Sequence, residues 1–134
     1  MRGRPEYDKP TDRMERSDWW GVVLETPDPS RLGHFYADLL DWKVATDTDH
    51  WVTVGPDEGV AYLGFQFSPS YQPPVWPAEG REQQMMMHLD FEVVDLDEAV
   101  EDAVDLGAVV HPHQPQDSVR VLLDPDGHPF CLYT

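Results

Sequence analysis

The chain has 134 residues, enough for one domain with a packed core, and its 40% hydrophobic content favours a globular fold over disorder. A formal net charge of −17, from 26 acidic against 9 basic residues, excludes nucleic acid as a partner, because a polyanion would be repelled. The apolar runs are too short to cross a membrane, and the polar residues 1–18 lack the apolar core of a signal peptide. The single cysteine excludes an internal disulfide, so we expect a cytoplasmic protein.

The first half of the chain is expected to form a strand, a helix and three further strands after a polar arm. Residues 1–18 combine prolines and charges without periodicity, which predicts a flexible arm before a single domain at 19–134. A first module at 19–67 opens with a strand-like run at 19–25, which ends at the turn residues 26–29, and Ser30 begins a helix with an apolar stripe at helical spacing. The remaining strands are expected to begin at Trp42, Trp51 and Val60.

A proline-rich linker at 68–84 separates this module from a second one at 85–134. Four prolines remove backbone donors and favour extended backbone, so no regular element is expected there. Tyr71 and Trp76 also lie in this linker, and burial of their rings would make it a packed strap.

The second module opens with a strand expected to run from Met85 to Val94, in which apolar and polar residues alternate. Because strand side chains alternate between faces, His88, Asp90 and Glu92 share one face. Asp95, followed three residues later by a glutamate, predicts a capped helix that ends at a glycine. Three strands are expected after the helix, at 108–111, 118–123 and 129–133.

The two modules repeat one plan at a constant spacing of 67 positions, from Asp28 to Asp95. Two βαβββ modules related by pseudo-twofold symmetry predict an α+β fold with a curved mixed sheet. Its helices would cover one face and leave the other as a concave cup. The spacing makes Gly21 the counterpart of His88, and Gly64 the counterpart of Cys131. The cup is expected to receive Gly21, Val23, Tyr62, Gly64, Gln66, His88, Asp90, Cys131 and Tyr133.

This plan and its motifs resemble the vicinal oxygen chelate superfamily, which includes glyoxalase I, bleomycin-resistance proteins, fosfomycin-resistance enzymes and extradiol dioxygenases. The likeness covers 19–134, and the run at 71–77 with the glutamines after it resembles a bacterial glyoxalase-like group. One fold hosts many functions, so the resemblance is specific for fold and not for activity. The motifs that carry it are Pro27-Asp28 before Phe35-Tyr36, His88-Leu89-Asp90, and Asp124-Pro125-Asp126-Gly127-His128.

The resemblance implies a divalent ion held at four cup positions, which would act as a Lewis acid on the substrate. His88 matches one position, whereas Gly21 offers no side chain and Cys131 stands where a glutamate is expected. The remaining position falls on Gly64, or on Gln66 if the register shifts by two. One imidazole, one amide and one thiol do not suit nickel, manganese, magnesium or iron. We therefore expect no catalytic metal and no cofactor. The alternative is a divalent ion, for instance a softer one such as zinc, with ligands from His88, Cys131 and Gln66 or Asp90.

The functional expectation is a protein that binds a small organic molecule in the cup without a catalytic metal, for sequestration or resistance. The alternative is a lyase or isomerase of the glyoxalase type that acts on a carbonyl compound, with His88 as ligand or base. Whether the chain is an enzyme is left open, and a homodimer is expected. The expected ligand-binding residues are Tyr62, Gln66, His88, Asp90, Arg120, Cys131 and Tyr133.

Four further side-chain groups have simpler interpretations. Cys131 is expected to be a buried small residue rather than a nucleophile, because few cations stand near it to lower its pKa. His111 and His113 are expected at a surface edge. Asp90 and Glu92 are expected to form a polar rim beside Arg120. The turn at 124–127 is interpreted as turn chemistry with no chemical role.

Overall fold

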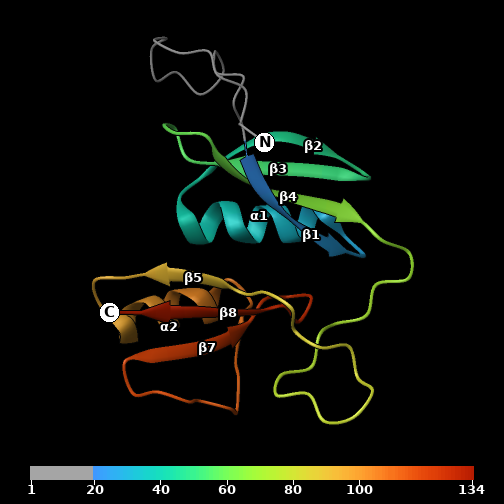
Figure 1. The fold of residues 1–134 in the computed structure, drawn as a ribbon. Coiled ribbons are helices and arrows are strands. Elements are labelled where there is room, and N and C mark those ends of the chain that lie inside the picture. The colour runs from blue at the N-terminus through green and yellow to red at the C-terminus, as the bar shows by residue number, and fades with distance from the viewer. Residues whose placement is uncertain (1–19) are drawn as a thin grey trace. The chain divides into compact units, whose positions relative to one another are not determined.

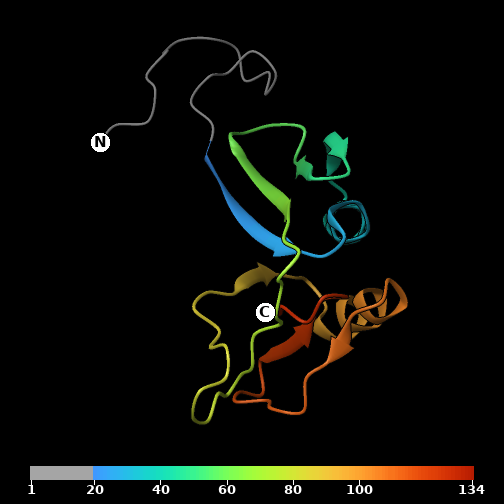
Figure 2. The same ribbon diagram turned by 90° about the vertical axis from the view of Figure 1, so that its right-hand side faces the viewer.

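A computed structural model describes residues 20–134, so the expected arm at 1–18 and Trp19 lie outside the described part of the chain. The chain divides into two compact units, the first ending at Pro69 and the second beginning at Ser70. Each unit combines a four-stranded sheet with one helix. Figures 1 and 2 show a helix beside strands in each unit. Across 20–134, every helix is too short or too polar to cross a bilayer.

The first unit is a mixed sheet with strand order β1-β4-β3-β2 and a helix, α1, packed against it. β1 and β4 run parallel, and the other neighbours are antiparallel. In chain order the elements are β1 (Trp20–Thr26), α1 (Pro29–Leu40), β2 (Lys43–Thr48), β3 (Trp51–Gly55) and β4 (Ala61–Phe67).

Local side-chain chemistry sets both ends of α1. Asp28 is the N-cap, and its carboxylate accepts a hydrogen bond from the Arg31 backbone N–H at 3.1 Å. Pro29 follows at the first helical position, where its missing N–H costs nothing. At the other end Asp41 takes a left-handed conformation with φ of 50°, and its backbone N–H bonds back to the helix. The helix therefore begins one residue before the expected Ser30.

The core of the first unit lies between α1 and the sheet. Alternation along the strands sends one set of apolar side chains to the helix, and Tyr36 is fully buried among them. Its ring stacks on Phe65, with centroids 5.5 Å apart, and meets Phe35 edge-on at 5.0 Å. The opposite sheet face stays partly exposed. The buried hydrophobic side chains of its strands are Leu24, Val52, Val54, Leu63 and Phe65.

Gly33 allows α1 to approach the sheet closely, which leads to a first prediction. A Cβ at Gly33 would lie 2.4 Å from Cγ1 of Val52 and 3.3 Å from the Phe65 ring, and both of these side chains are fully buried. Gly33→Ala should therefore destabilise the protein by about 1–3 kcal/mol through overpacking, less the gain of about 1 kcal/mol in helix propensity. Urea unfolding measures the change. His34→Ala, at an exposed position of the same helix, is the control, and a stabilised Gly33→Ala protein would contradict the packing argument.

The second unit repeats this architecture with strand order β5-β8-β7-β6 and one parallel pair, β5 with β8. α2 packs against its sheet. In chain order the elements are β5 (Leu89–Glu92), α2 (Leu96–Asp105), β6 (Val109–Val110), β7 (Val119–Leu123) and β8 (Pro129–Tyr133).

The expected repeat and the α+β fold class are confirmed. The two helices begin 67 positions apart, at Pro29 and Leu96, and each has an aspartate N-cap whose side chain accepts from the first turn. Strand order and strand direction match between the units. A concave cup shared by the modules stays a prediction.

Two strands of the second unit are shorter than the sequence predicts. The strand expected from Met85 to Val94 is ordered as a strand only over β5, so His88 lies just before it. Continuing the register would pair His88 with Pro129, which has no N–H to donate. The strand expected at 108–111 is reduced to β6. The His111 backbone N–H still donates to the Val121 carbonyl, but the Val121 N–H donates to the Gln114 side-chain oxygen and not to a backbone carbonyl, so the ladder ends there.

Candidate functional site

Three side chains that could each supply a metal-ligand atom, one nitrogen, one oxygen and one sulfur, meet on one face of the second sheet. We call them the three donors in this sense of a ligand atom. Asp90 on β5 pairs with Cys131 on β8, so both point to the same face. His88 precedes Asp90 by two residues and joins them. The ligand atoms of these three residues all lie within 4.8 Å of one another. The expected grouping on one face is thus present among the described residues.

Access and hydrogen bonding differ among the three. Nε2 of His88 lies 3.2 Å from Oδ1 of Asp90, and the two side chains are 33% and 58% exposed. Cys131 is buried at the base of the group and its thiol bonds to the Asp90 carboxylate. The exposed carboxylate and imidazole can therefore contact a ligand from solvent, while the thiol contributes from beneath.

Burial, then the charge of Asp90 and its hydrogen bond with the thiol, raises the pKa of the Cys131 thiol from 9.0 to about 11. A raised thiol pKa favours the protonated S–H, so at neutral pH Cys131 is a neutral donor and not a thiolate. This supports the expectation that Cys131 is not a nucleophile.

Alkylation of Cys131 tests this placement, and the chain has no other cysteine to confuse the result. With the pKa at about 11 instead of 9.0, the thiolate fraction at pH 8 is roughly 100-fold lower, since each pKa unit is tenfold. The iodoacetamide rate should still rise beyond pH 9 towards 11. Asp90→Asn removes the charge and should speed alkylation at pH 8. Asp105→Asn, on α2, should not, and a rate plateau near pH 9 would contradict the raised pKa.

The linker places an indole against this group. The Trp76 ring stacks on the His88 imidazole with centroids 5.8 Å apart and planes 18° apart. The rings of His111 and His113 also lie beside the Trp76 ring, with centroids 6.4 and 5.5 Å from its centroid. His113 is exposed and His111 is half-buried, which agrees with the expected surface edge, but sequence reasoning missed their common contact with Trp76.

The register corrects the expected place of Arg120. Arg120 pairs with Leu132, whereas Val121 pairs with Cys131. Because paired residues point to the same face, Arg120 lies on the sheet face opposite the three donors. Its guanidinium donates to the Asp117 carbonyl at 2.8 Å. It therefore does not form a rim with the carboxylates, and its role in ligand binding stays a prediction.

The other expected binding residues are divided between the two units. Tyr133 pairs with Glu92, two positions along from Cys131 and Asp90, so both lie on the face of the three donors. Tyr62 and Gln66 belong to β4 in the first unit, on the sheet face away from the core. A binding role for these residues stays a prediction.

The first unit offers no side-chain ligand at the positions that correspond to His88 and Cys131. A Cβ at Gly21 would lie 2.6 Å from the Tyr62 ring, and one at Gly64 would lie 2.6 Å from the Trp51 ring. Two aromatic rings thus occupy the space that ligating side chains would need. Nickel, manganese, magnesium or iron of the glyoxalase type does not fit this donor set. The imidazole, carboxylate and thiol in the second unit are ligand types that zinc accepts.

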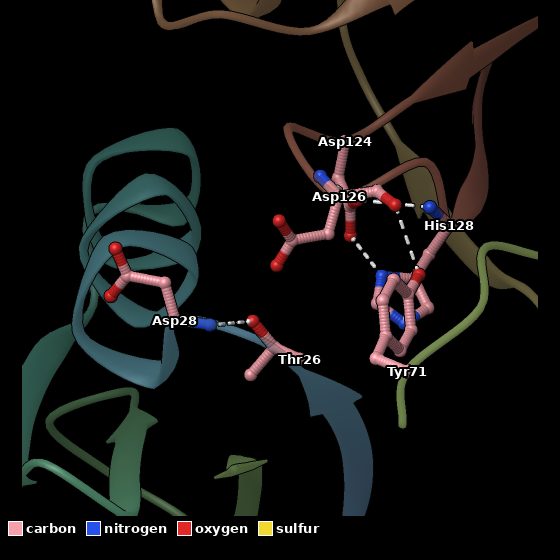
Figure 3. A network of polar contacts seen from close by, with 6 residues as sticks. All are labelled: Thr26, Asp28, Tyr71, Asp124, Asp126 and His128. Atoms are coloured by element: carbon pink, nitrogen blue, oxygen red, sulfur yellow. Dashed lines mark hydrogen bonds and ion pairs between the residues drawn. The ribbon is translucent and has the colours of Figure 1, made fainter. Parts of the chain in front are cut away.

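A second polar group, which sequence reasoning missed, lies in the turn between β7 and β8 (Figure 3). Oδ1 of Asp124 accepts from the backbone N–H groups of Asp126 and His128, each at 2.9 Å. Its Oδ2 lies 2.9 Å from Nδ1 of His128, and Nε2 of that ring lies 3.2 Å from the Tyr71 hydroxyl. Burial, then the charges of the two aspartates, raises the pKa of Tyr71, so the phenol stays protonated. The aspartate and histidine four residues apart were the available sequence signal.

Comparison with known proteins gives one matching family model and several structural neighbours. A family model described as a glyoxalase-like domain matches residues 21–133. A glyoxalase/bleomycin resistance protein/dioxygenase family enzyme from Burkholderia phytofirmans PsJN is 16% identical, with a TM-score of 0.61, over 84% of this chain and 94% of that one. The fosfomycin resistance protein FosX from Mesorhizobium loti is 16% identical, with a TM-score of 0.62, over 86% and 89%. FosX from Listeria monocytogenes, also 16% identical, has a TM-score of 0.63 over 88% and 91%. No curated protein matches the chain.

Proposed function

The chain belongs to the glyoxalase-like domain family, and from that premise we propose that it binds a small organic molecule on the sheet face that carries His88, Asp90 and Cys131. Binding would proceed without the hard divalent ion of glyoxalase-type chemistry, and its purpose would be sequestration or resistance. The resemblance to solved FosX structures supports the fold that presents this face.

The observation that carries the proposal is the convergence of three different polar groups within 4.8 Å. A ligand on this face meets an exposed carboxylate that accepts hydrogen bonds and an imidazole that donates or accepts, while the neutral thiol beneath them donates to the carboxylate. The indole of Trp76 and the ring of Tyr133 add apolar surface in the same unit. A few convergent polar groups beside aromatic surface are typical of small-molecule sites.

Charge indicates the class of ligand. Asp90 and Glu92 share the face, and the chain as a whole has a net charge of −17. A phosphorylated or carboxylated molecule would meet repulsion, whereas a cationic or neutral one would not. We therefore expect amines and uncharged polar molecules to bind better than organic phosphates.

The His88–Asp90 pair favours one alternative, a lyase or isomerase acting on a carbonyl compound. A carboxylate 3.2 Å from an imidazole nitrogen can orient a general base. A metal-assisted form of this activity would rest on zinc held by the same three side chains. Elemental analysis of the purified protein separates these cases, because a stoichiometric metal would favour the enzyme and sink the metal-free proposal.

Chemical-shift mapping tests the proposed binding. The protein is treated with a chelator, labelled with ¹⁵N, and titrated with a library of small amines, uncharged polar compounds and organic phosphates. We expect the amide shifts caused by hits to cluster at 88–92 and 131–133, with few phosphates among the hits. Hits whose shifts avoid both segments would contradict the proposed face.

Association into a homodimer and a cytoplasmic location remain part of the proposal. Exposed apolar side chains on α2, at its C-cap and on β6 support self-association, because such surface is unfavourable in water. Sedimentation velocity would show a dimer, and a monomer at all concentrations would contradict it. These side chains are Val104, Leu106, Val109 and Val110.

A further inference from the structure

Residues 70–77 form a segment that we call the strap, and two of its aromatic side chains contact the rest of the second unit. Tyr71 reaches the turn between β7 and β8, and Trp76 lies against His88. Pro73 and Pro74 stand between them and restrict the backbone, because proline fixes φ and favours extended chain. The strap is therefore a stiff connection between a polar network and the candidate site.

The network at the Tyr71 end is satisfied by well-placed partners. The Asp124 side chain has no exposed surface and holds Nδ1 of His128 at 2.9 Å. A carboxylate at Nδ1 fixes the proton there, which leaves Nε2 of the neutral ring as an acceptor. The Tyr71 hydroxyl then has two acceptors in reach, Nε2 at 3.2 Å and the Asp126 carbonyl at 3.0 Å. If Nε2 gains a proton, the hydroxyl accepts from it and donates to the carbonyl, so the contact persists.

Close backbone approach reinforces this attachment. Gly127 has φ of 90°, in the left-handed region that favours glycine. A Cβ at this position would lie 3.0 Å from Cβ of Pro73, so the strap passes directly over the turn. Tyr71 and Pro73 are thus held on the same turn by a hydrogen-bonded network and by packing.

At the other end of the strap, Trp76 contacts histidine rings from two other segments of the unit. Its indole is nearly parallel to the His88 imidazole and meets His113 edge-on. The backbone N–H of Val75 donates to the Gln83 carbonyl at 2.7 Å and closes the loop that follows. That hydrogen bond connects two residues of the same loop and does not reach the β7–β8 turn. The contacts of Tyr71 therefore fix the position of the strap on that turn.

From this arrangement we propose that Asp124, His128 and Tyr71 form a latch that fixes the strap and thereby holds the Trp76 indole against His88. Tyr71 and His128 are then positioning residues of the candidate site, although neither is one of its three donors. The importance of this for ligand binding rests on the proposed function. The positioning itself does not, because it can be measured on ligand-free protein.

The test follows the ring signals of His88 by NMR, assigned by their loss in His88→Ala. The ring current of the stacked Trp76 indole shifts the NMR signals of the His88 ring protons. Trp76→Leu removes the indole and so gives the chemical shifts of these protons without the ring current. Tyr71→Phe, which removes only the hydroxyl, should remove most of that shift. Pro73→Gly, which keeps the hydroxyl but loosens the connection, should remove part of it. For any ligand found on the site face, Tyr71→Phe should also weaken affinity roughly twofold to tenfold, the range expected from one hydrogen bond.

A matched control is the exposed pair of His34 and Asp47 in the first unit, whose atoms Nε2 and Oδ2 lie 2.8 Å apart. His34→Ala should leave the His88 signals unchanged. Circular dichroism confirms that each variant is folded. If Tyr71→Phe fails to fold, the Pro73→Gly variant is used in its place. In whichever of the two variants is folded, His88 ring signals that stay at their wild-type positions would overturn the latch. Shifted His88 signals with no ligand found would keep the latch and reject the proposed function.

Discussion

Asp124→Ala is expected to destabilise the protein by about 3 kcal/mol, because it leaves buried donors without their acceptor. The Asp124 side chain is fully buried, and its Oδ1 accepts from two backbone N–H groups at 2.9 Å. Its Oδ2 also holds the His128 ring. The turn between β7 and β8 therefore depends on this one carboxylate. Urea unfolding followed by circular dichroism measures the loss.

Asp124→Asn separates hydrogen bonding from charge in this turn. The amide oxygen can still accept from the backbone N–H groups, while the amide NH₂ faces His128 in place of Oδ2. We expect a loss of roughly 1–2 kcal/mol, smaller than that of the alanine variant. Asp105→Asn, at an exposed position of α2 outside this turn, should cost less than either. Equal stability of Asp124→Ala and wild type would show that the network has no structural role.

Tyr36→Ala is expected to cost about 3–5 kcal/mol, the range for removing a large aromatic ring from a core. The residue has no exposed surface, and its ring lies between Phe35 and Phe65. Its removal opens a cavity between α1 and the sheet of the first unit. The free energy of unfolding in guanidinium chloride gives the loss, with the slope of the transition checked for a change in cooperativity.

Tyr36→Phe keeps the stacked ring and serves as the control. It should recover most of the stability lost in Tyr36→Ala, because the contact with Phe65 depends on the ring. If the two variants were equally unstable, ring packing would not be the cause of the loss.

Sequence reasoning predicted the fold well because the relevant signals are local or repeated. Asp95 and the glutamate three residues later predicted the start of α2, and the Asp95 side chain caps that helix by accepting from the backbone two and three residues on. The repeat at a spacing of 67 positions allowed each element to be predicted from two segments of the sequence. The structure repeats strand order and direction between the two units. Strand ends were less predictable, as β5 shows, because they depend on the partner strand.

The candidate site was predicted only in part, and the reason is distance along the chain. Alternation placed His88 and Asp90 together, and the repeat added Cys131. Trp76 and Tyr71 contact partners brought close by the fold of the linker, 55 and 57 positions away in the case of Tyr71. Arg120 was assigned to the wrong surroundings, because a shift of one residue in register exchanges the two faces of a strand.

The central claim is that His88, Asp90 and Cys131 bind an organic ligand without a hard divalent ion. Isothermal titration of the best library hit into chelator-treated protein tests it most directly, with His88→Ala, Asp90→Asn and the control His34→Ala beside wild type. We predict stoichiometric binding to wild type, unaffected by added nickel or manganese, and a loss of about tenfold in each site variant, equivalent to 1.4 kcal/mol. His34→Ala should bind as wild type does. Binding that requires the added metal, or that is equally strong in all four proteins, would contradict the account.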